Sequence, residues 1–591
     1  MTGIMEYIIK EILKQLMACG SVTNTEREKK AEIWMLDFFR KLPYFQKYPE
    51  QCGLFPIPGD PLERSTVWAL VTTGQTMTGM FKAKAANGPV ASDVSNASNT
   101  VVTDETARTS NASHKPTVIL MGHHDVVEAD VYGDTKSWAF DMDNITAHLN
   151  EKALSSEAHS DLLSGEWIFG RGSCDMLGGT AVQLAVLKKR AEAVLKKFDA
   201  APQGTNTDVE AVSQEIHAEP ETVPQGSNND KGALLFISVP DEESFSVGMR
   251  GTLPLLEQLK EQYNLDYCLA VCAEPNQRTA DGRTQIIYSG SIGKLLPVVL
   301  VQGRTVQIGS CRDGVNPLGI LSRIVAATEG DESFTETCEG EVSVPPVWMY
   351  ARDLKEGYDF SLPHRAVGYC NVLTFRKTPA QVLAYFLGKI RAAVESASQP
   401  VAVMTWVTLW QQAKQQEGFA AFWRETEDWT RKMLQEQHKT YPEVTLWLMQ
   451  ATLDFIHLDK PVVLLGFAPP YYPAVRSEDM KHAARFEKYK KAITALQKVK
   501  VDPYFPGVSD CSYCGLPTGT TANAWQANTP LWGDAYHFDM EALERVQIPF
   551  FLFGPWGKDL HQIGERVNRY SLTEEYPAVL EKLLRCVWLS K

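Results

Sequence analysis

The chain has 591 residues, too many for one hydrophobic core, and at roughly 150 residues per domain this length predicts two to four domains. Hydrophobic residues make up 44% and charged residues 22%, which is the composition of an ordinary globular protein and excludes a largely disordered one. The net charge of −14, without any long run of lysine or arginine, argues against a nucleic-acid partner.

The compartment is also constrained by composition. Every apolar stretch is shorter than the roughly 18 residues that a membrane span requires, so no membrane partner is expected. Glu6 and Glu11 interrupt what would be the apolar core of a signal sequence, and residues 1–20 are predicted to form an amphipathic helix instead. The 11 cysteines show no regular spacing, which favours a reducing compartment. We expect a cytoplasmic protein.

The first half of the chain alternates between helical and strand patterns. Helical periodicity predicts helices at residues 4–18, 26–41 and 178–197. Apolar runs predict strands at residues 66–71, 117–121, 166–169 and 233–239. Stretches of small polar residues without periodicity predict surface insertions at about 75–115 and 199–231. The alternation predicts an α/β catalytic domain with a mostly parallel sheet over residues 1–287.

The pattern changes after residue 288. Strands at Leu295–Gln302 and Ala366–Phe375 and helices at about 315–328 and 379–395 predict a small α+β lid domain over residues 288–400. Residues 401–460 are predicted to form a helical insertion. Apolar runs at 461–465 and 548–553 are expected to be strands that return to the first domain. The catalytic domain would then be discontinuous, with a second part at residues 461–591.

Five residues with metal-binding side chains follow apolar runs that we predict to be buried strands. They are His123, Asp175, Glu243, Glu274 and His561. In open α/β sheets, ligands bind at the carboxyl ends of the strands, so these side chains are expected to converge on one crevice. This layout predicts a two-metal hydrolase.

The local motifs support both functional and ordinary interpretations. Asp125 stands two residues after His123 and could fix its tautomer, although histidines beside aspartates are common on surfaces. Asp175 lies on a glycine-rich turn before a predicted helix, where a carboxylate can present two oxygens to metals or can simply cap the helix. The neighbouring carboxylates of Glu242 and Glu243 project to opposite sides of an extended chain, so one can bind metal while the other acts as a general base.

The ordered set of motifs resembles the family of di-zinc exopeptidases and deacylases that includes aminoacylase, carboxypeptidase G and succinyl-diaminopimelate desuccinylase. The matching segments are Gly122–Val127, Gly170–Gly179, Asp241–Glu243, Glu274-Pro275 and Gly554–Glu565. The chain is similar to the RocB-like, arginine-utilisation branch of this family in the segments Ser21–Thr25, Gly290–Leu295, Pro469–Pro473 and Phe505–Tyr513.

The resemblance implies a fold, a cofactor and residue roles. The fold would be a discontinuous catalytic domain of the di-zinc exopeptidase type with an inserted α+β lid. His123 and Glu274 would hold one Zn²⁺, Glu243 and His561 the other, and Asp175 would bridge both, with Co²⁺ or Mn²⁺ as substitutes. Glu242 would be the general base and Asp125 the clamp behind His123. The substrate would be a small acylated amino acid or peptide.

The resemblance also implies a homodimer joined through the lids, for which the apolar strand Leu295–Gln302 is the expected edge. The family commonly carries a lid histidine that reaches the partner's active site, and this chain has Gln307 there, which we expect to act as a weaker donor to the carbonyl oxygen. Arg376, at a position where some relatives bind the substrate carboxylate, and Asn316 are the predicted substrate-binding residues.

Three functional interpretations stay open at this point. The leading one is a metal-dependent amidohydrolase or exopeptidase. Because Gln307 replaces the lid histidine, the second is a catalytically silent relative that serves as a structural or interaction scaffold. The third is an amidase with Cys174 as nucleophile, but the sequence offers no group that would activate this thiol.

Overall fold

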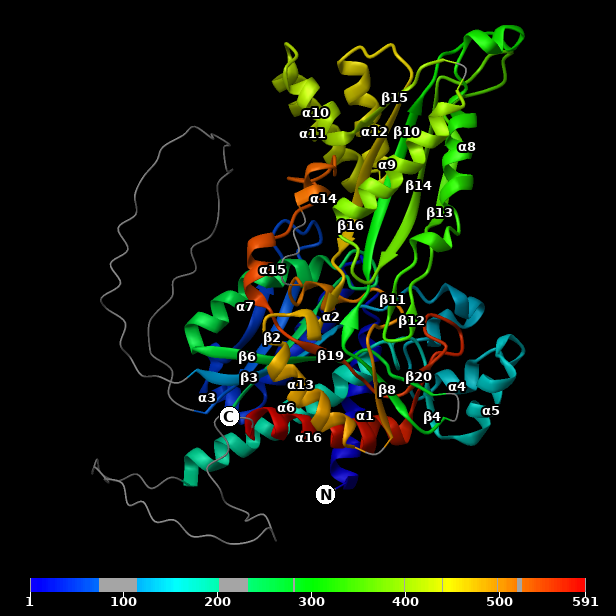
Figure 1. Ribbon diagram of the computed structural model, residues 1–591. Coiled ribbons are helices and arrows are strands. Elements are labelled where there is room, and N and C mark those ends of the chain that lie inside the picture. Colours follow the sequence, from blue (N-terminus) through cyan, green and yellow to red (C-terminus); the bar gives the residue numbers. More distant parts are fainter. Residues whose placement is uncertain are drawn as a thin grey trace, which may run out of the picture.

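The computed structural model describes residues 2–73, 114–200, 232–279, 282–397, 399–437, 439–496, 498–517 and 523–589. The surface insertions predicted at about 75–115 and 199–231 lie almost wholly outside the described residues. The described chain forms two main sheets, one standing above the other in the view of Figure 1.

The first sheet has nine strands in the order β1-β2-β5-β3-β6-β19-β8-β18, with β7 paired to β8. Its central strands run parallel to one another and are β5 (Ala233–Val239), β3 (Lys115–His123), β6 (Leu265–Cys272) and β19 (Phe550–Leu552). The flanking strands are β1 (Cys52–Pro56), β2 (Ser65–Val71), β7 (Gln277–Arg278), β8 (Gln285–Tyr288) and β18 (Val499–Asp502). Antiparallel pairing is confined to the flanks of the sheet. The predicted α/β class with a mostly parallel central sheet is confirmed.

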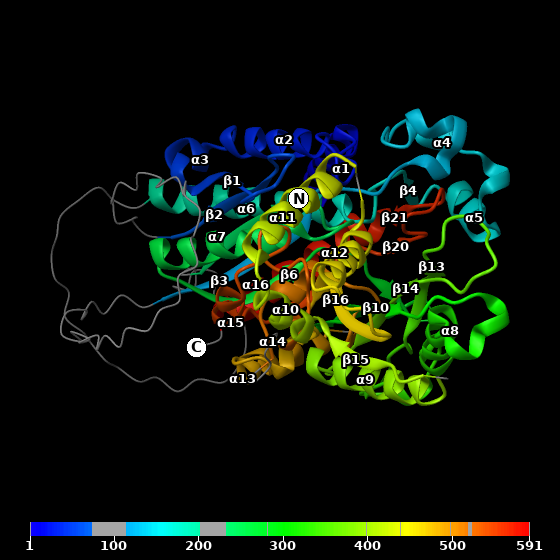
Figure 2. The ribbon, with the colours of Figure 1, turned by 90° about the horizontal axis from the view of Figure 1, so that it is seen from above.

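Helices cover both faces of this sheet. Alternate residues of β3 face opposite sides: Val118 and Leu120 pack with the helices of one face, whereas Ile119 and Met121 pack toward the other. The helices of the first face are α1 (Thr2–Cys19), α2 (Glu28–Arg40), α6 (Leu177–Ala200), α13 (Ala483–Thr494) and α16 (Tyr576–Leu589); those of the second are α7 (Val247–Tyr263) and α15 (Met540–Val546). Figure 2 shows α2 alongside β1 and β2. Because the sheet is covered on both sides, every residue of β5 is buried.

The second sheet has five strands in the order β13-β14-β10-β16-β15. These are β13 (Val347–Asp353), β14 (Arg365–Thr374), β10 (Gly293–Gln302), β16 (Val462–Tyr472) and β15 (Ala402–Thr405). One face packs against α8 (Pro317–Thr328) and α9 (Pro379–Glu395), and the other against α10 (Trp406–Lys414), α11 (Phe419–Gln435) and α12 (Tyr441–Phe455). The predicted lid and helical insertion thus share one sheet (Figure 1).

Two strand assignments in this region were wrong. The run at 461–465 belongs to β16, which pairs with β10 in the second sheet and not with the first sheet. Its residues are all buried, and a run that is apolar on both faces suits either sheet, so its partner cannot be deduced from its hydrophobicity. Strand β10 lies between β14 and β16, which excludes it as the edge that pairs two chains. The run at 548–553 does return to the first sheet, as β19.

The strand predicted at 166–169 is β4 (Trp167–Phe169), but it lies outside both main sheets. It forms a small antiparallel sheet with β21 (Arg566–Asn568) and β20 (Gly557–Lys558). The remaining short elements are α3 (Pro43–Lys47), α4 (Ile145–His148), α5 (Ser156–Ser164), α14 (Asn523–Ala527), β9 (Gly290–Ser291), β11 (Thr337–Cys338), β12 (Glu341–Val342) and β17 (Val475–Arg476). Among the described helices, none combines the length and the apolar character that a membrane crossing needs.

Candidate metal centre

The predicted ligands come from five separate places in the chain. His123 is the last residue of β3, Glu243 lies in the turn after β5, and Glu274 stands two residues beyond β6. These three strands are parallel neighbours, so their carboxyl ends meet at one edge of the sheet. Asp175 precedes α6, and His561 lies between β20 and β21, whose sheet includes the strand before Asp175. The small sheet, not the main one, therefore delivers these last two ligands.

The structure brings all five predicted ligands together with Glu242. The Nε2 atom of His123 lies 3.4 Å from Asp175 Oδ1, 3.9 Å from Glu242 Oε2 and 4.0 Å from Glu274 Oε1. Two groups of three residues each have ligand atoms that all lie within 4.8 Å of one another. The first group is His123, Glu242 and Glu274, and the second is His123, Asp175 and Glu243. The ligand spacing is that of a metal site.

Asp175 lies between the two histidines. One of its oxygens, Oδ1, faces His123, and the other, Oδ2, is 3.2 Å from Nε2 of His561. The same nitrogen of His561 is 3.1 Å from Glu243 Oε2. A carboxylate that offers one oxygen to each histidine has the geometry of a bridging ligand. His561 is the accessible member, with 48% of its side chain exposed, so the centre is open to solvent on that side.

The residues present fit a divalent cation. The Nε2 atom of His123 is buried and has no hydrogen-bond partner among the described residues, as expected for a nitrogen that binds metal. Mixed imidazole and carboxylate donors suit Zn²⁺, and Co²⁺ or Mn²⁺ can replace it in such sites. Four carboxylates at this spacing repel one another without a cation. A divalent cation would therefore be held by the imidazole and carboxylate groups of the site and would offset the repulsion between the carboxylates.

The pKa values of these groups reflect the crowding. Burial, followed by the negative charge of Glu274, raises the pKa of Glu242 well above its ordinary value. Hydrogen bonds to Asp175 and Glu243 raise the pKa of His561 to about 10. Burial opposes protonation of His123, but the nearby carboxylates of Asp125 and Asp175 outweigh it and raise its pKa well above the usual value. The raised pKa values reflect the excess of negative charge in the site.

Asp125 does more than the sequence predicts. Its backbone carbonyl oxygen lies 2.9 Å from His123 Nδ1, closer than its carboxylate at 3.5 Å, so the carbonyl is the main acceptor that orients the ring. Its two carboxylate oxygens accept hydrogen bonds from the backbone N–H groups of Glu242 and Glu243, each at 3.1 Å. One buried aspartate therefore aligns a ligand from β3 with the turn after β5.

Arg171 and Glu565 also support the centre, and neither was assigned a role in the sequence analysis. Both side chains are fully buried and form an ion pair. Glu565 Oε1 also accepts from the backbone N–H groups of Gly172, at 2.8 Å, and Asp175, at 3.4 Å. Arg171 donates to the carbonyl oxygen of His561 at 3.1 Å. The pair connects the two segments that supply Asp175 and His561.

The remaining predicted site residues lie elsewhere on this chain. Gln307 is exposed on the lid and belongs to neither group of ligand atoms. Asn316 is exposed and caps α8, where its side chain accepts from the N–H groups of Leu318 and Gly319. The local pair Asn316-Pro317 is a typical helix start, so this structural role was available from the sequence.

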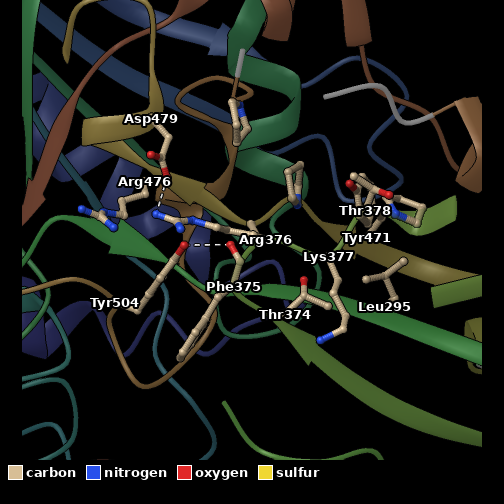
Figure 3. Close-up of a pocket in the computed structure, with 14 residues that line it drawn as sticks. Leu295, Thr374, Phe375, Arg376, Lys377, Thr378, Tyr471, Arg476, Asp479 and Tyr504 are labelled. Carbon is tan, nitrogen blue, oxygen red and sulfur yellow. Dashed lines mark hydrogen bonds and ion pairs between the residues drawn. The ribbon is translucent and has the colours of Figure 1, made fainter. Parts of the chain in front are cut away.

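Arg376 follows β14 and lines a separate cavity of about 380 Å³, together with Leu295, Thr374 and Tyr471 of the second sheet. Figure 3 shows its guanidinium directed toward Asp479, at 3.6 Å, beside Tyr504. None of the ligand candidates of the metal centre lines this cavity. The structure therefore places Arg376 apart from the centre.

Two known proteins are similar in sequence to this chain over nearly its whole length. No family model matches the sequence. The uncharacterised protein YqjN of Bacillus subtilis is 27% identical over 607 residues, which cover 96% of this chain and 94% of that protein. RocB of Bacillus subtilis is 24% identical, covering 97% of this chain and 94% of RocB.

Solved structures that align with this chain over nearly its whole length include two proteins described as members of the M20 family. One is the metallo-carboxypeptidase Sso-CP2 of Sulfolobus solfataricus, with 12% identity, a TM-score of 0.48 and coverage of 98% and 99% of the two chains. The other is the dinuclear metal-binding peptidase YXEP of Bacillus subtilis, with 10% identity, a TM-score of 0.48 and full coverage of both chains. The predicted resemblance to the RocB-like branch is confirmed by the sequence comparison: this chain is a relative of RocB and YqjN over nearly its whole length.

Proposed function

We propose that this protein is a zinc-dependent hydrolase that cleaves an amide or peptide bond in a small acylated amino acid or peptide. The observation that carries the proposal is the convergence of five ligands on one point, with Asp175 between two histidines and Glu242 beside them. His123 and Glu274 would hold one cation, Glu243 and His561 the second, and Asp175 both. We also propose that the protein is cytoplasmic, as expected from its irregularly spaced cysteines.

The chemistry divides between the cofactor and the chain. When bound, two cations would lower the pKa of a water molecule and polarise the scissile carbonyl group. Glu242 would take a proton from that water and deliver it to the leaving amine. In the metal-free chain, burial and the charge of Glu274 raise the pKa of Glu242. The Asp125 carboxylate keeps Glu242 in place by accepting a hydrogen bond from the backbone N–H of Glu242.

The structure gives no support to Cys174 as a nucleophile. Burial and the neighbouring charge of Glu565 raise the pKa of its thiol well above the ordinary value. A thiol needs to be a thiolate to attack a carbonyl carbon, so these surroundings make Cys174 inert.

Metal removal is the direct test of the proposal. A chelator should abolish hydrolysis and lower the melting temperature, and Zn²⁺ should restore both, because a cation that binds only the folded state stabilises it by about 4 kcal/mol at a thousandfold excess over its Kd. Elemental analysis, thermal melting and an activity screen over N-acyl amino acids and dipeptides would measure these effects. Two metals without activity on any substrate would favour the scaffold interpretation.

The neighbouring histidine provides a matched control. His124 is equally buried, but its Nδ1 atom lies 3.1 Å from Ser238 Oγ, and it belongs to neither ligand group. His123→Asn should lose the Zn²⁺-dependent rise in melting temperature, whereas His124→Asn should keep it. An unchanged rise in His123→Asn would contradict the assignment.

We further propose a homodimer that is paired through β13 in place of β10. This strand is one of the two edges of the second sheet, the other being β15, and it exposes Val347, Met349 and Tyr350 by 41%, 59% and 37%. An exposed apolar edge strand is a template for pairing with a second chain. Gln307 would then reach the partner's centre as a donor to the carbonyl oxygen.

Two charges on this edge should separate the chains. The double variant Val347→Asp, Met349→Asp should sediment as a monomer, since like charges would meet across the two-fold axis, and its kcat should fall by about 10²–10³ because Gln307 no longer acts on the partner. Its metal content should not change. Sedimentation of the unaltered protein as a monomer at micromolar concentration would reject the dimer.

A further inference from the structure

A buried ionic cluster lies next to the turn that carries Glu242 and Glu243. Its centre is Arg64, which is 3% exposed and is surrounded by the carboxylates of Glu28, Asp60 and Asp241. These residues come from the start of α2, from the loop between β1 and β2, and from the end of β5. None of them belongs to the two groups of ligand atoms in the metal centre.

Arg64 makes a specific set of hydrogen bonds. Its Nε and one terminal nitrogen bond the two oxygens of Asp60, at 3.0 and 2.8 Å, in a two-pronged arrangement. The other terminal nitrogen donates to both Glu28, at 2.7 Å, and Asp241, at 2.9 Å. A planar guanidinium can satisfy three carboxylates in this way, whereas a lysine ammonium is a single point of charge.

Asp241 organises the turn that follows it. Its φ angle is +68°, a left-handed conformation that is costly for a residue with a side chain and persists only where the surroundings enforce it. Its carbonyl oxygen accepts from three successive backbone N–H groups, those of Ser244, Phe245 and Ser246. Its side-chain Oδ2 accepts from the N–H of Val247, at 3.2 Å, while Oδ1 binds Arg64.

The turn is therefore held from two sides. On the side of the metal centre, Asp125 accepts from the N–H groups of Glu242 and Glu243. On the other side, Glu28 accepts from the N–H of Asp241 at 3.0 Å while it also binds Arg64. Asp125 contacts the ligand His123 as well, and Asp241 connects the Arg64 cluster to the turn that carries Glu242 and Glu243.

We propose that Arg64 is a positioning residue for the metal centre: by binding Glu28, Asp60 and Asp241 together, it enforces the left-handed turn at Asp241 and so directs the carboxylates of Glu242 and Glu243 toward the metals. This inference rests on the proposed function for its catalytic consequence. Its structural part, the order of residues 241–247, concerns the chain alone.

The structural part is tested on the metal-free protein by hydrogen–deuterium exchange. Arg64→Lys keeps the positive charge but loses the planar guanidinium that binds three carboxylates. It should accelerate amide exchange in residues 241–247 by about tenfold or more. Arg365→Lys is the matched control, because Arg365 is a buried arginine of β14 that binds Gln302 of β10 and Asp454 of α12. It should leave exchange in residues 241–247 unchanged. Equal exchange there in both variants would overturn the proposal.

The catalytic part is tested by metal titration and kinetics of the same two variants. Arg64→Lys should weaken binding of at least one metal by about 10–100-fold and lower kcat with little change in KM, while Arg365→Lys should alter neither. Unchanged metal affinity and kcat in Arg64→Lys would reduce Arg64 to a structural residue and overturn the proposal. If the unaltered protein binds no metal, the proposed function fails, and the exchange experiment still decides the role of Arg64.

Glu28→Gln provides a second, milder variant should Arg64→Lys not fold. The carboxylate accepts at both oxygens, from Arg64 and from the N–H of Asp241, and a glutamine amide can accept at only one. The same acceleration of exchange in residues 241–247 is expected. Exchange that matches the unaltered protein would count against the proposal as well.

Discussion

Replacing Glu242 by glutamine should leave both metals bound and lower kcat by about 10²–10⁴-fold, the contribution of a general base. The side chain of Glu242 is 11% exposed and its Oε2 lies 3.9 Å from His123 Nε2, which places it at the centre of the site. Glutamine has nearly the same shape but cannot accept and release a proton at pH 7. Activity on an authentic substrate and metal content by elemental analysis are the two measurements.

Glu243→Gln is the matched control, since the two residues are neighbours of the same kind. Glu243 lies 3.1 Å from His561 Nε2 and 6% of its side chain is exposed, so its loss should empty one metal position. Glu242 and Glu274 lie 3.9 and 4.0 Å from His123, so these distances do not show which residue is the base and which is a metal ligand. Comparing Glu242→Gln with Glu243→Gln does distinguish a base from a ligand. Equal metal loss in both would reject this division of roles.

Local signals predicted most elements of the fold. The helix expected at 379–395 is α9, Pro379–Glu395, because Thr378 and Gln381 form a capping box in front of an apolar stripe. The strand expected at 233–239 is β5, since an apolar run bounded by polar residues has few alternatives. Such features depend on residues within one turn or one strand, and the sequence displays them directly.

Strand pairing was harder to predict because it depends on distant residues. The expected position of β10 at an edge was wrong: β10 pairs with β14 on one side and with β16, about 160 residues later, on the other. Strand β4 likewise pairs with β21, which lies near the end of the chain. Nothing in the composition of an apolar strand identifies its neighbour, and the edges of the lid sheet are β13 and β15.

The centre itself was predictable to the extent that strand ends imply convergence. His123, Glu243 and Glu274 follow parallel neighbours of the main sheet, so their meeting is a consequence of the topology. The supporting groups were not predictable in this way. Arg171 and Glu565 are separated by 394 residues, and each is a single charged residue with no local pattern that marks it as buried.

The largest loss of metal is expected from Asp175→Asn, because one carboxylate oxygen of Asp175 faces each of the two histidines. Its Oδ1 lies 3.4 Å from His123 and its Oδ2 3.2 Å from His561, whereas an asparagine amide offers a single acceptor oxygen. A pair of cations would then lose the shared negative charge that offsets their repulsion. The variant should retain at most one metal per chain, and kcat should fall by more than about 10³ because both metals act on the same water and carbonyl group.

The lid offers a control for this variant. Asp331 is also bound by several donors, Tyr385, Lys389 and Ser333, but it lies far along the chain from the centre and in neither ligand group. Asp331→Asn should lower the melting temperature without changing metal content, since the loss of these bonds affects the lid alone. Calorimetric titration with Zn²⁺ would compare the two proteins. Two metals bound to Asp175→Asn with the affinity of the unaltered protein would show that Asp175 is a helix-capping residue and no bridge, and the second cation would then need a different set of ligands.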